Sequence, residues 1–226
     1  MRRFLADVLP ESGGELCLPR DISHHLLRVT GIAPGEQVEL FDGRGRAVVA
    51  RLVGVEAGLA RVRGEADVLQ DAPPPLVLLA GLMRQGPFDT TVRMATELGV
   101  TALVPVLCRR SVARGERVDR WERIARAAAA QCGRADVPQV ANPCSLRDAL
   151  LAVPAGHHRL VCVPGAPVGL APAGALAILL GPEGGLAPDE IDLAGDSGFQ
   201  PFGLGGTVLR GDTAAATAMA LVLLRS

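Results

Sequence analysis

The 226-residue sequence contains no lysine and no tyrosine, and aromatic residues make up only 3% of it. All 23 basic residues are therefore arginines, which excludes a Schiff-base lysine and the lysine of a nucleotide-binding P-loop. The scarcity of aromatics, with Trp121 as the one tryptophan, argues against RNA recognition through many stacked bases. A net charge of −1 also argues against a chain that binds nucleic acid over its whole surface.

Signals for metal binding, secretion and membrane insertion are also missing. The two histidine pairs have no further ligand at metal-binding spacing. No apolar signal sequence opens the chain, and no apolar run reaches the length of a membrane span. We therefore expect a cytoplasmic protein with no metal and no membrane partner. The cysteines include no CxxC pair, which predicts buried free thiols in place of a zinc site or disulfides (Cys17, Cys108, Cys132, Cys144 and Cys162).

Arginine is concentrated in two parts of the chain. One part is the N-terminal third, and the other runs from Arg109 to Arg134. The segment 181–200 contains acidic residues and no basic ones. This asymmetry favours an anionic partner held on one side of the protein, although a solvated surface position explains any single arginine equally well.

A break in composition divides the chain into two predicted domains. Three consecutive prolines within 71–75 predict a stiff linker. Residues 1–70 contain short alternating segments, including a hairpin over 36–53 and a strand over 59–63, which predict a small β-barrel. In 76–226, strands alternate with helices, which predicts an α/β domain with a mostly parallel sheet. The expected strands cover 76–82, 101–107, 160–163 and 177–180, and the expected helices cover 88–98, 120–132, 145–153 and 211–224, with one more beginning at Pro188.

Two glycine-rich loops follow apolar strands near the C-terminus. They read Gly-Pro-Glu-Gly-Gly over 181–185 and Leu-Gly-Gly-Thr-Val-Leu-Arg over 204–210. Neither has the spacing of a dinucleotide fingerprint or a P-loop, but at the carboxyl ends of parallel strands both would line one pocket. Apolar walls and backbone groups without lysine fit an adenosine-like ligand such as S-adenosylmethionine better than a triphosphate. The residues expected to bind it are Leu180, Gly181, Gly184, Gly185, Leu204, Gly205, Val208 and Leu209.

Charged residues beside these loops are candidates for chemistry. Glu183 either faces the ligand or orders the first loop. Arg210 either holds a phosphate or a polarised carbonyl group, or pairs with Asp212. Asp189 and Glu190 stand in the first turn of a predicted helix, where carboxylates stabilise the positive end of the helix dipole. We expect these last two residues to be structural.

A set of short motifs occurs in a fixed order along almost the whole chain. They are His24-His25-Leu26, Ala-Thr-Glu-Leu-Gly-Val over 95–100, Arg110-Ser111, Arg120-Trp121, Gln131-Cys-Gly-Arg134 followed by Val137-Pro138, the 181–185 loop, and Leu209-Arg210 with Thr213-Ala214. In this order they resemble the RsmE-type 16S ribosomal RNA uracil-N3 methyltransferases of the SPOUT superfamily. The resemblance implies an N-terminal PUA-like β-barrel and a C-terminal α/β domain whose deep trefoil knot binds S-adenosylmethionine. It also implies a homodimer, for which small residues of the last helix would allow close packing (Ala214, Ala215, Ala218 and Met219).

The resemblance further implies methylation of N3 of a uridine in 16S ribosomal RNA of the small subunit. Arg210 would stabilise negative charge on the uracil carbonyl oxygens, and Glu183 or Asp212 would accept the N3 proton. Two alternatives stay open: a SPOUT methyltransferase that acts on a ribose 2′-OH or a tRNA base, and a non-enzymatic RNA-binding assembly factor. The residues implied to contact RNA are Arg3, Arg28, Arg84, Arg110 and Arg134.

Three positions depart from the pattern that the resemblance implies. Gly31 and Thr207 stand where the family usually has arginine, and Asp212 stands where it usually has glutamate. The first two changes remove positive charge, so they affect expected RNA contacts. None of the three positions is among the residues expected to bind the cofactor, so we expect the cofactor site to be intact.

Overall fold

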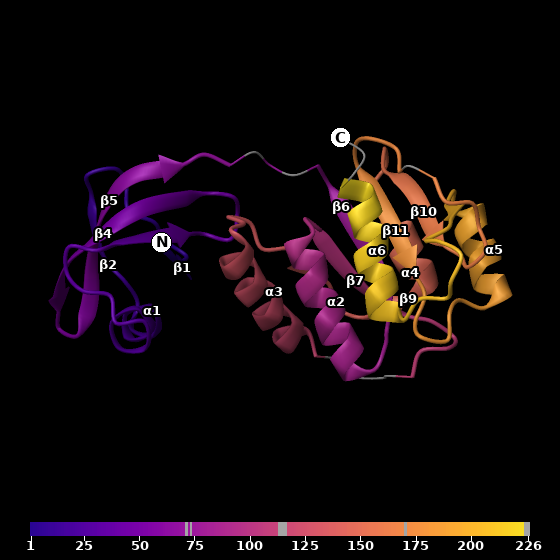
Figure 1. Cartoon of the computed structure of the whole chain (residues 1–226), viewed down its shortest axis with the longest axis horizontal. Coiled ribbons are helices and arrows are strands. Elements are labelled where there is room, and N and C mark those ends of the chain that lie inside the picture. Colours follow the sequence, from indigo (N-terminus) through magenta and orange to yellow (C-terminus); the bar gives the residue numbers. More distant parts are fainter. Residues whose placement is uncertain (71, 73, 113–116, 170, 224–226) are drawn as a thin grey trace. The chain divides into compact units, whose positions relative to one another are not determined.

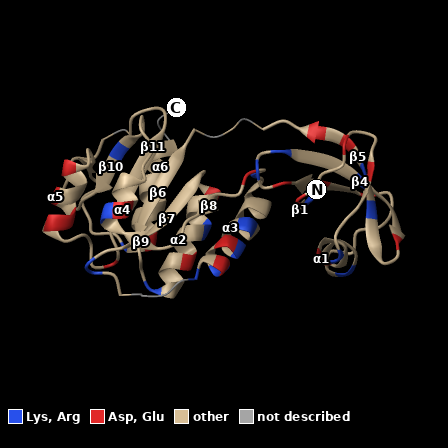
Figure 2. Ribbon diagram, turned by 180° about the vertical axis from the view of Figure 1, so that it is seen from behind, with Lys and Arg blue, Asp and Glu red and all other residues tan. Residues whose placement is uncertain are grey.

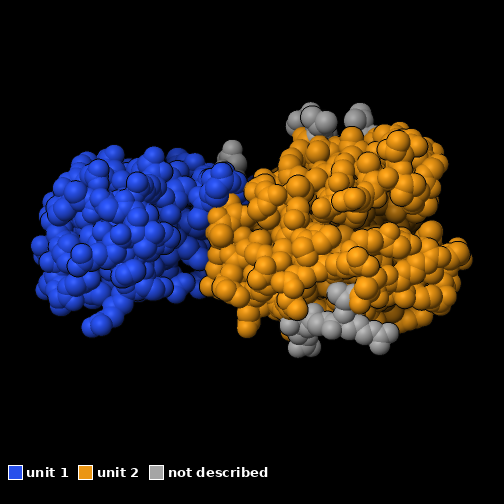
Figure 3. All heavy atoms as spheres, turned by 60° about the horizontal axis from the view of Figure 1, so that its bottom comes forward, with its two compact units in different colours: residues 1–72, 129–137 blue, residues 73–128, 138–226 orange. Residues whose placement is uncertain are grey.

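The structure is a computed structural model that describes residues 1–70, 72, 74–112, 117–169 and 171–223. It forms two compact units, which are blue and orange in Figure 3. The first unit contains Met1–Ala72 and Ala129–Val137, and the second contains Pro73–Ala128 and Pro138–Ser226.

The first unit is discontinuous in sequence. We expected residues 129–137 in the second domain, but in the structure they belong to the first unit. Ala129 and Ala135 are buried in one cluster with Phe41 and Ala47, and this burial fixes the segment there. Of the linker predicted over 71–75, positions 71 and 73 lie outside the described residues.

The described residues of the first unit build a five-stranded sheet. Its strands are β1 (Arg2–Leu5), β2 (Glu15–Cys17), β3 (Gln37–Phe41), β4 (Ala47–Glu56) and β5 (Leu59–Val68), in the spatial order β1-β3-β4-β5-β2. β1 runs parallel to β3, and the other neighbours are antiparallel. The hairpin predicted over 36–53 is confirmed as β3 and β4. Asp42 stabilises its turn, because its Oδ1 accepts the backbone N–H groups of Arg44 and Arg46 at 2.7 and 3.1 Å.

Two short helical segments follow β2. They are α1 (Arg20–His24) and the π-helical turn η1 (His25–Val29), and Leu26 of η1 is fully buried in the core of this unit. The sequence did not predict either segment, because five residues are too few to show a helical period. β5 also runs past the predicted end at residue 63.

The second unit is built on a sheet whose seven described strands are all parallel to their neighbours. Every residue of β6 and β11 is buried, as their unbroken apolar runs predict for strands covered on both faces. The order is β12-β10-β11-β6-β7-β8, and β9 also pairs with β7. The bounds are β6 (Leu76–Gly81), β7 (Ala102–Leu107), β8 (Gln139–Val140), β9 (Cys144–Ser145), β10 (His158–Cys162), β11 (Leu176–Leu180) and β12 (Gln200–Phe202). The predicted parallel sheet is confirmed.

Pro105 causes the irregularity that the sequence predicted in β7. Proline has no N–H to donate, so it interrupts a ladder on one side of its strand. β8 pairs with Ala102 and Leu103, and β9 pairs with Val106 and Leu107. Pro105 lies at the gap between these two short strands.

Helices cover both faces of this sheet (Figure 1). α4 and α5 share a core cluster with Val77, Leu79 and Val106 on one face. α2 and α6 pack against each other, and α6 also contacts β11. The bounds are α2 (Gln85–Glu97), α3 (Val118–Cys132), α4 (Leu146–Leu151), α5 (Pro188–Asp196) and α6 (Gly211–Leu223).

The small-residue face of α6 is covered within the chain. We expected this face at a homodimer interface, but all four residues are buried by the packing of α6 on its own unit (Ala214, Ala215, Ala218 and Met219). That expectation is corrected. The small side chains allow α6 to approach α2 closely.

The chain passes close to itself just after β12. Val163 N donates to Phe202 O at 3.1 Å, and Gly203 N donates to Pro167 O at 2.9 Å. A Cβ at Gly203 would overlap the carbonyl oxygen of Ala166. Glycine is therefore required where the chain leaves β12 and crosses toward α6.

Candidate cofactor pocket

A cavity of about 260 Å³ lies at the carboxyl ends of β10 and β11 in the second unit. Its walls come from Cys162, Val163 and Pro164 at the end of β10, from the loop after β11, and from the loop between β12 and α6. Most lining residues are glycine or apolar. Ligands of open α/β sheets bind at this edge, where parallel strands end together.

The structure brings the two glycine loops together around this cavity. Every residue expected to bind the cofactor lines it (Leu180, Gly181, Gly184, Gly185, Leu204, Gly205, Val208 and Leu209). Glu183 and Arg110 line it as well. Arg210 and Asp212 are absent from the described residues that line it, although their neighbours Leu209 and Gly211 are present.

Glu183 anchors the first loop to the start of α2. Its side chain is exposed, and its Oε1 accepts the backbone N–H of Arg84 at 2.9 Å. Arg84 is the N-cap residue of α2, so the carboxylate lies at the positive end of that helix. The ordering role considered for Glu183 is therefore observed, and its second oxygen can still accept a proton.

Glu190 joins the first loop to the segment after β7. It is 8% exposed, and its two oxygens accept the backbone N–H groups of Arg109 and Ala187, each at 2.8 Å. Ala187 has no side-chain oxygen, so only the glutamate half of a capping box forms at the start of α5. The structural role expected of Glu190 thus extends to a second loop. This link to Arg109 was not predicted from the sequence, because the two residues are 81 positions apart.

We predict that Glu190→Gln lowers the free energy of unfolding by about 1–3 kcal/mol. The amide can accept from one N–H group, but it presents its own NH₂ to the other and leaves that buried donor unpaired. Urea unfolding monitored by circular dichroism measures the change. The control is Asp189→Asn, which breaks only an exposed ion pair with Arg109 (2.6 Å) and should cost less than about 1 kcal/mol. Equal losses in the two variants would contradict the prediction.

The second loop is more exposed than the first. Val208 is 84% exposed although it lines the cavity. Gly205 has φ +127°, a conformation that residues with side chains rarely adopt. When a ligand covers an exposed apolar side chain, the removal of that apolar surface from water favours binding. The cavity therefore favours a ligand with apolar surface.

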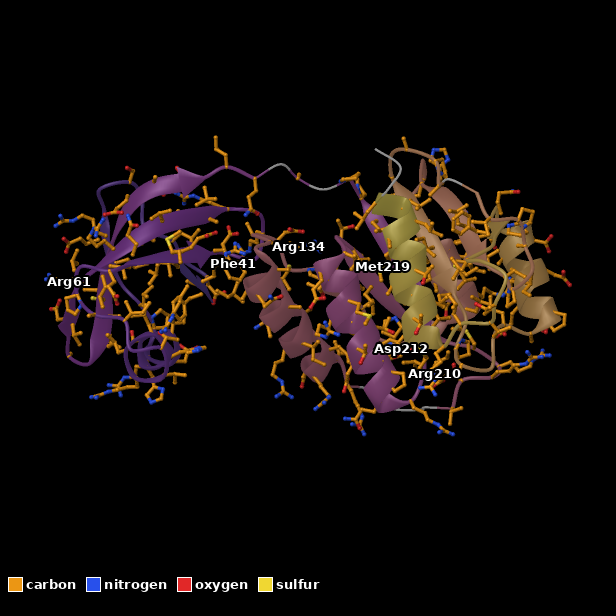
Figure 4. The ribbon with its side chains drawn as sticks, in the orientation of Figure 1. Phe41, Arg61, Arg134, Arg210, Asp212 and Met219 are labelled. Carbon is orange, nitrogen blue, oxygen red and sulfur yellow. The ribbon has the colours of Figure 1, made fainter. Side chains whose placement is uncertain are left out.

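Arg210 and Asp212 lie at the start of α6 (Figure 4). Arg210 is exposed, and its carbonyl oxygen accepts the backbone N–H of Ala214. Asp212 is half-buried, and its Oδ1 accepts the backbone N–H of Thr213 at 2.9 Å. Among the ion pairs of the described residues, none joins Arg210 to Asp212. The guanidinium of Arg210 is therefore available beside the pocket.

Two of the arginines implied to contact RNA have structural partners in the first unit. The Arg3 side chain is 10% exposed, pairs with Glu39 at 2.9 Å, and lies over the ring of Phe41. The Arg134 side chain is 12% exposed and makes two hydrogen bonds to Asp136. Guanidinium groups that are mostly covered and already paired with a carboxylate are poorly placed to bind a phosphate. The implied RNA contacts of Arg3 and Arg134 are therefore corrected.

The other three arginines are exposed but differ in their contacts. Arg28 lies in η1 and Arg84 at the start of α2. Arg110 also has an exposed side chain, but it donates hydrogen bonds to the first glycine loop. Figure 2 shows basic residues at many separate positions along the ribbon, so charge alone does not single out one RNA-binding face.

Among the residues that the structure describes, no three or more histidine, cysteine, aspartate or glutamate side chains lie together as a metal site would require.

Of the free cysteines, Cys108 is buried as expected. Cys17 and Cys132 are exposed, which corrects the expectation that all are buried. Burial, followed by the charge of Glu190, raises the pKa of the Cys108 thiol to about 12. Among the described helices, none has the length and apolar character needed to cross a bilayer.

Comparison with known proteins identifies the family of the chain. An RNA methyltransferase domain family matches residues 70–223, and an RNA methyltransferase PUA domain family matches residues 18–63. Ribosomal RNA small subunit methyltransferase E of Mycobacterium bovis is 35% identical over 237 residues, which cover 97% of this chain and 90% of that protein. The chain belongs to the RsmE family of RNA methyltransferases. The same enzyme of Synechocystis is 31% identical and covers 88% of this chain and 69% of that protein.

Two solved methyltransferase structures share the whole fold. The structure of ribosomal RNA small subunit methyltransferase E from Neisseria gonorrhoeae, bound to S-adenosyl methionine, has a TM-score of 0.92 at 32% identity and covers 99% of this chain and 97% of that one. A putative methyltransferase from Legionella pneumophila with the same cofactor has a TM-score of 0.87 at 26% identity and covers 98% of this chain and 96% of that one. The predicted fold class, an α/β methyltransferase domain with a PUA-like β domain, is confirmed.

Proposed function

We propose that this protein transfers a methyl group from S-adenosylmethionine to N3 of a uridine in 16S ribosomal RNA. The observation that carries the proposal is one cavity lined by both glycine loops, in a chain of the RsmE family. The relative from N. gonorrhoeae is bound to S-adenosyl methionine. Relatives named as small-subunit ribosomal RNA methyltransferases support 16S RNA as the substrate.

The residues of the cavity fit this cofactor. A Cβ at Gly185 or at Gly205 would meet no atom within 4 Å, so both glycines leave open space. Backbone N–H and C=O groups of the loops can therefore reach a ligand, and Leu180 and Leu204 supply apolar surface for its adenosine portion. When bound, S-adenosylmethionine supplies an electrophilic methyl group that the protein must orient and shield from water.

The chain's own groups can prepare N3 of uracil for methylation. N3 must lose its proton, and the negative charge then spreads onto the two neighbouring carbonyl oxygens. Arg210, exposed beside the pocket, stabilises this charge. Of the two carboxylates considered as proton acceptor, Glu183 lines the cavity and Asp212 does not. We therefore assign the proton to Glu183.

The thiol of Cys162 is compatible with this chemistry. Cys162 lines the cavity, and burial raises the pKa of its thiol to about 12. A thiolate would compete with uracil for an electrophilic methyl group, because the thiolate is the nucleophilic form. At neutral pH this cysteine stays protonated, so the competing reaction is suppressed.

The close passage at Gly203 supports the knot that the resemblance implies. The segment after β10 makes backbone hydrogen bonds with the end of β12. From there the chain crosses to α6, which packs beyond β10 on β11 and α2. A chain that passes through the loop after β10 would produce these contacts.

We further propose that the protein is a cytoplasmic homodimer. Of the five arginines implied to contact RNA, we assign this role to Arg28 and Arg84, because both are exposed and neither side chain binds the pocket loops. The side of α6 opposite its buried face supports self-association, because it carries partly exposed apolar residues and the 50%-exposed Leu223. Analytical ultracentrifugation tests this assembly.

A methyl-transfer assay tests the proposed function. Purified protein and labelled S-adenosylmethionine are incubated with small ribosomal subunits from a strain that lacks this gene, and the nucleosides are analysed by mass. We expect 3-methyluridine at one site. Methylation of a ribose, or of transfer RNA only, would favour a different SPOUT activity. Binding to subunits without any cofactor binding would favour the assembly factor.

A further inference from the structure

The segment after β7 and the first glycine loop exchange hydrogen bonds in both directions. Arg110 Nη1 donates to the carbonyl oxygens of Gly184 (2.9 Å) and Leu186 (3.3 Å). In return, the carboxylate of Glu190, just past that loop, accepts the backbone N–H of Arg109 at 2.8 Å. A side chain from each segment thus binds the backbone of the other. The two segments are fixed to each other beside the cavity.

The aliphatic part of Arg110 also packs on the loop. A Cβ at Gly184 would lie 3.1 Å from Arg110 Cβ and 3.5 Å from its Cδ. The arginine stem therefore occupies the space that a larger residue at position 184 would need. Arg110, Gly184 and Leu186 all line the cavity, so this packing forms part of its wall.

The hydrogen bonds of Arg110 suit an internal role better than an RNA contact. Bonds from a charged donor to carbonyl oxygens are stronger than neutral ones. An RNA phosphate could draw this guanidinium away only by breaking two such bonds, and the loop carbonyls of Gly184 and Leu186 would lose their donor. Removing the side chain would free the same loop that carries Gly181 and Gly185 to the cavity.

We propose that Arg110 is a positioning residue of the cofactor pocket: its guanidinium holds the carbonyl groups of Gly184 and Leu186 and thereby fixes the first glycine loop around the adenosine portion of the cofactor. This replaces the RNA contact that the family resemblance implied. The inference rests on the proposed function, because it needs an adenosine-containing ligand in this cavity.

Binding measurements on the full-length protein test the proposal. Isothermal titration gives the Kd of S-adenosylmethionine and of 5′-methylthioadenosine, which lacks the amino-acid portion. Filter binding without cofactor gives the Kd of small ribosomal subunits. The variants are Arg110→Gln and Arg110→Lys. The matched control is Arg123→Gln, because exposed Arg123 also donates to a backbone carbonyl, that of Asp119, but away from the residues that line the cavity.

We expect Arg110→Gln to raise the Kd of both nucleosides about tenfold, as loss of charge-assisted hydrogen bonds predicts. Arg110→Lys should recover part of the affinity, because a single nitrogen makes both bonds in the structure. Subunit binding should stay the same as in the wild-type protein for both variants, because the proposal gives Arg110 no contact with RNA. Arg123→Gln should change neither nucleoside Kd.

Two results would overturn the inference. One is weaker subunit binding with unchanged nucleoside binding, which would restore the RNA contact. The other is a loss confined to S-adenosylmethionine, which would mean that Arg110 binds the amino-acid portion of the cofactor directly. Failure of the wild-type protein to bind either nucleoside is a separate outcome, because it would overturn the proposed function itself and the inference with it.

Discussion

Arg210→Ala is expected to lower kcat for uridine methylation by about 10²–10³-fold, the effect of removing one donor that stabilises developing negative charge. The structure leaves this guanidinium exposed at the start of α6, next to the cavity-lining residues Leu209 and Gly211. Because the side chain itself does not line the cavity, the Kd of S-adenosylmethionine should change little. Single-turnover methylation of small subunits, with the cofactor Kd measured separately, distinguishes these two effects.

Arg93→Ala is the matched control for this experiment. Arg93 is an exposed arginine of the same unit, and it pairs with Glu97 one turn along α2. Such a pair contributes roughly 0.3–0.5 kcal/mol, so its loss should leave kcat unchanged. If Arg210→Ala kept the wild-type kcat, the charge-stabilising role would be wrong. An increase in the cofactor Kd alone would point to a role in shaping the second loop.

Gly203→Ala is expected to destabilise the protein by about 3 kcal/mol or more, which is at or beyond the upper end of the usual cost of overpacking. The new methyl group would overlap the carbonyl oxygen of Ala166, and that oxygen belongs to backbone, which cannot rotate away as a side chain can. The neighbouring backbone hydrogen bonds, Gly203 N to Pro167 O and Val163 N to Phe202 O, would have to lengthen. Urea unfolding gives the loss of stability.

Gly206→Ala provides the comparison within the same loop. A Cβ at Gly206 would meet no atom within 4 Å, and its φ is outside the range that strains a side chain. This variant should therefore stay within about 0.5 kcal/mol of wild type. Similar stabilities for the two alanine variants would show that the chain can separate at Gly203 without cost, and would remove this support for the knot.

The parts of the fold that the sequence predicted are those with strong local signals. The unbroken apolar runs of β6 and β11 identify strands buried on both faces. Gly99 and Gly133, with φ of +87° and +91°, follow α2 and α3 where the sequence placed their ends. The two glycine loops could be assigned to one pocket because parallel strands end at the same edge. Short elements such as η1 and β8 have no such signal.

Side-chain partners could not be predicted in the same way. Arg3 looks like Arg28 in the sequence, but Glu39 pairs with it in the folded chain. Arg110 was grouped with RNA contacts for the same reason, because its acceptors lie more than 70 positions away, at Gly184 and Leu186. The partner of Arg134, Asp136, is only two residues away, so this pair is local and was overlooked. The sequence shows where the arginines occur, but the role of each one depends on the residues that surround it in the folded chain.

The discontinuous first unit has a consequence for how this protein could be assembled or inherited. A fragment that ends at Ala72 would lack Ala129 and Ala135, and Phe41 and Ala47 would then face water where the intact chain buries them. That fragment would keep the larger core cluster of the unit, which runs from Phe4 to Val62, but it would leave the smaller cluster around Phe41 incomplete. During synthesis this smaller cluster cannot be completed until Ala135 has emerged from the ribosome, whereas every residue of the larger cluster precedes the proline-rich junction. A gene rearrangement at the proline-rich junction would transfer the sheet without the segment that seals it.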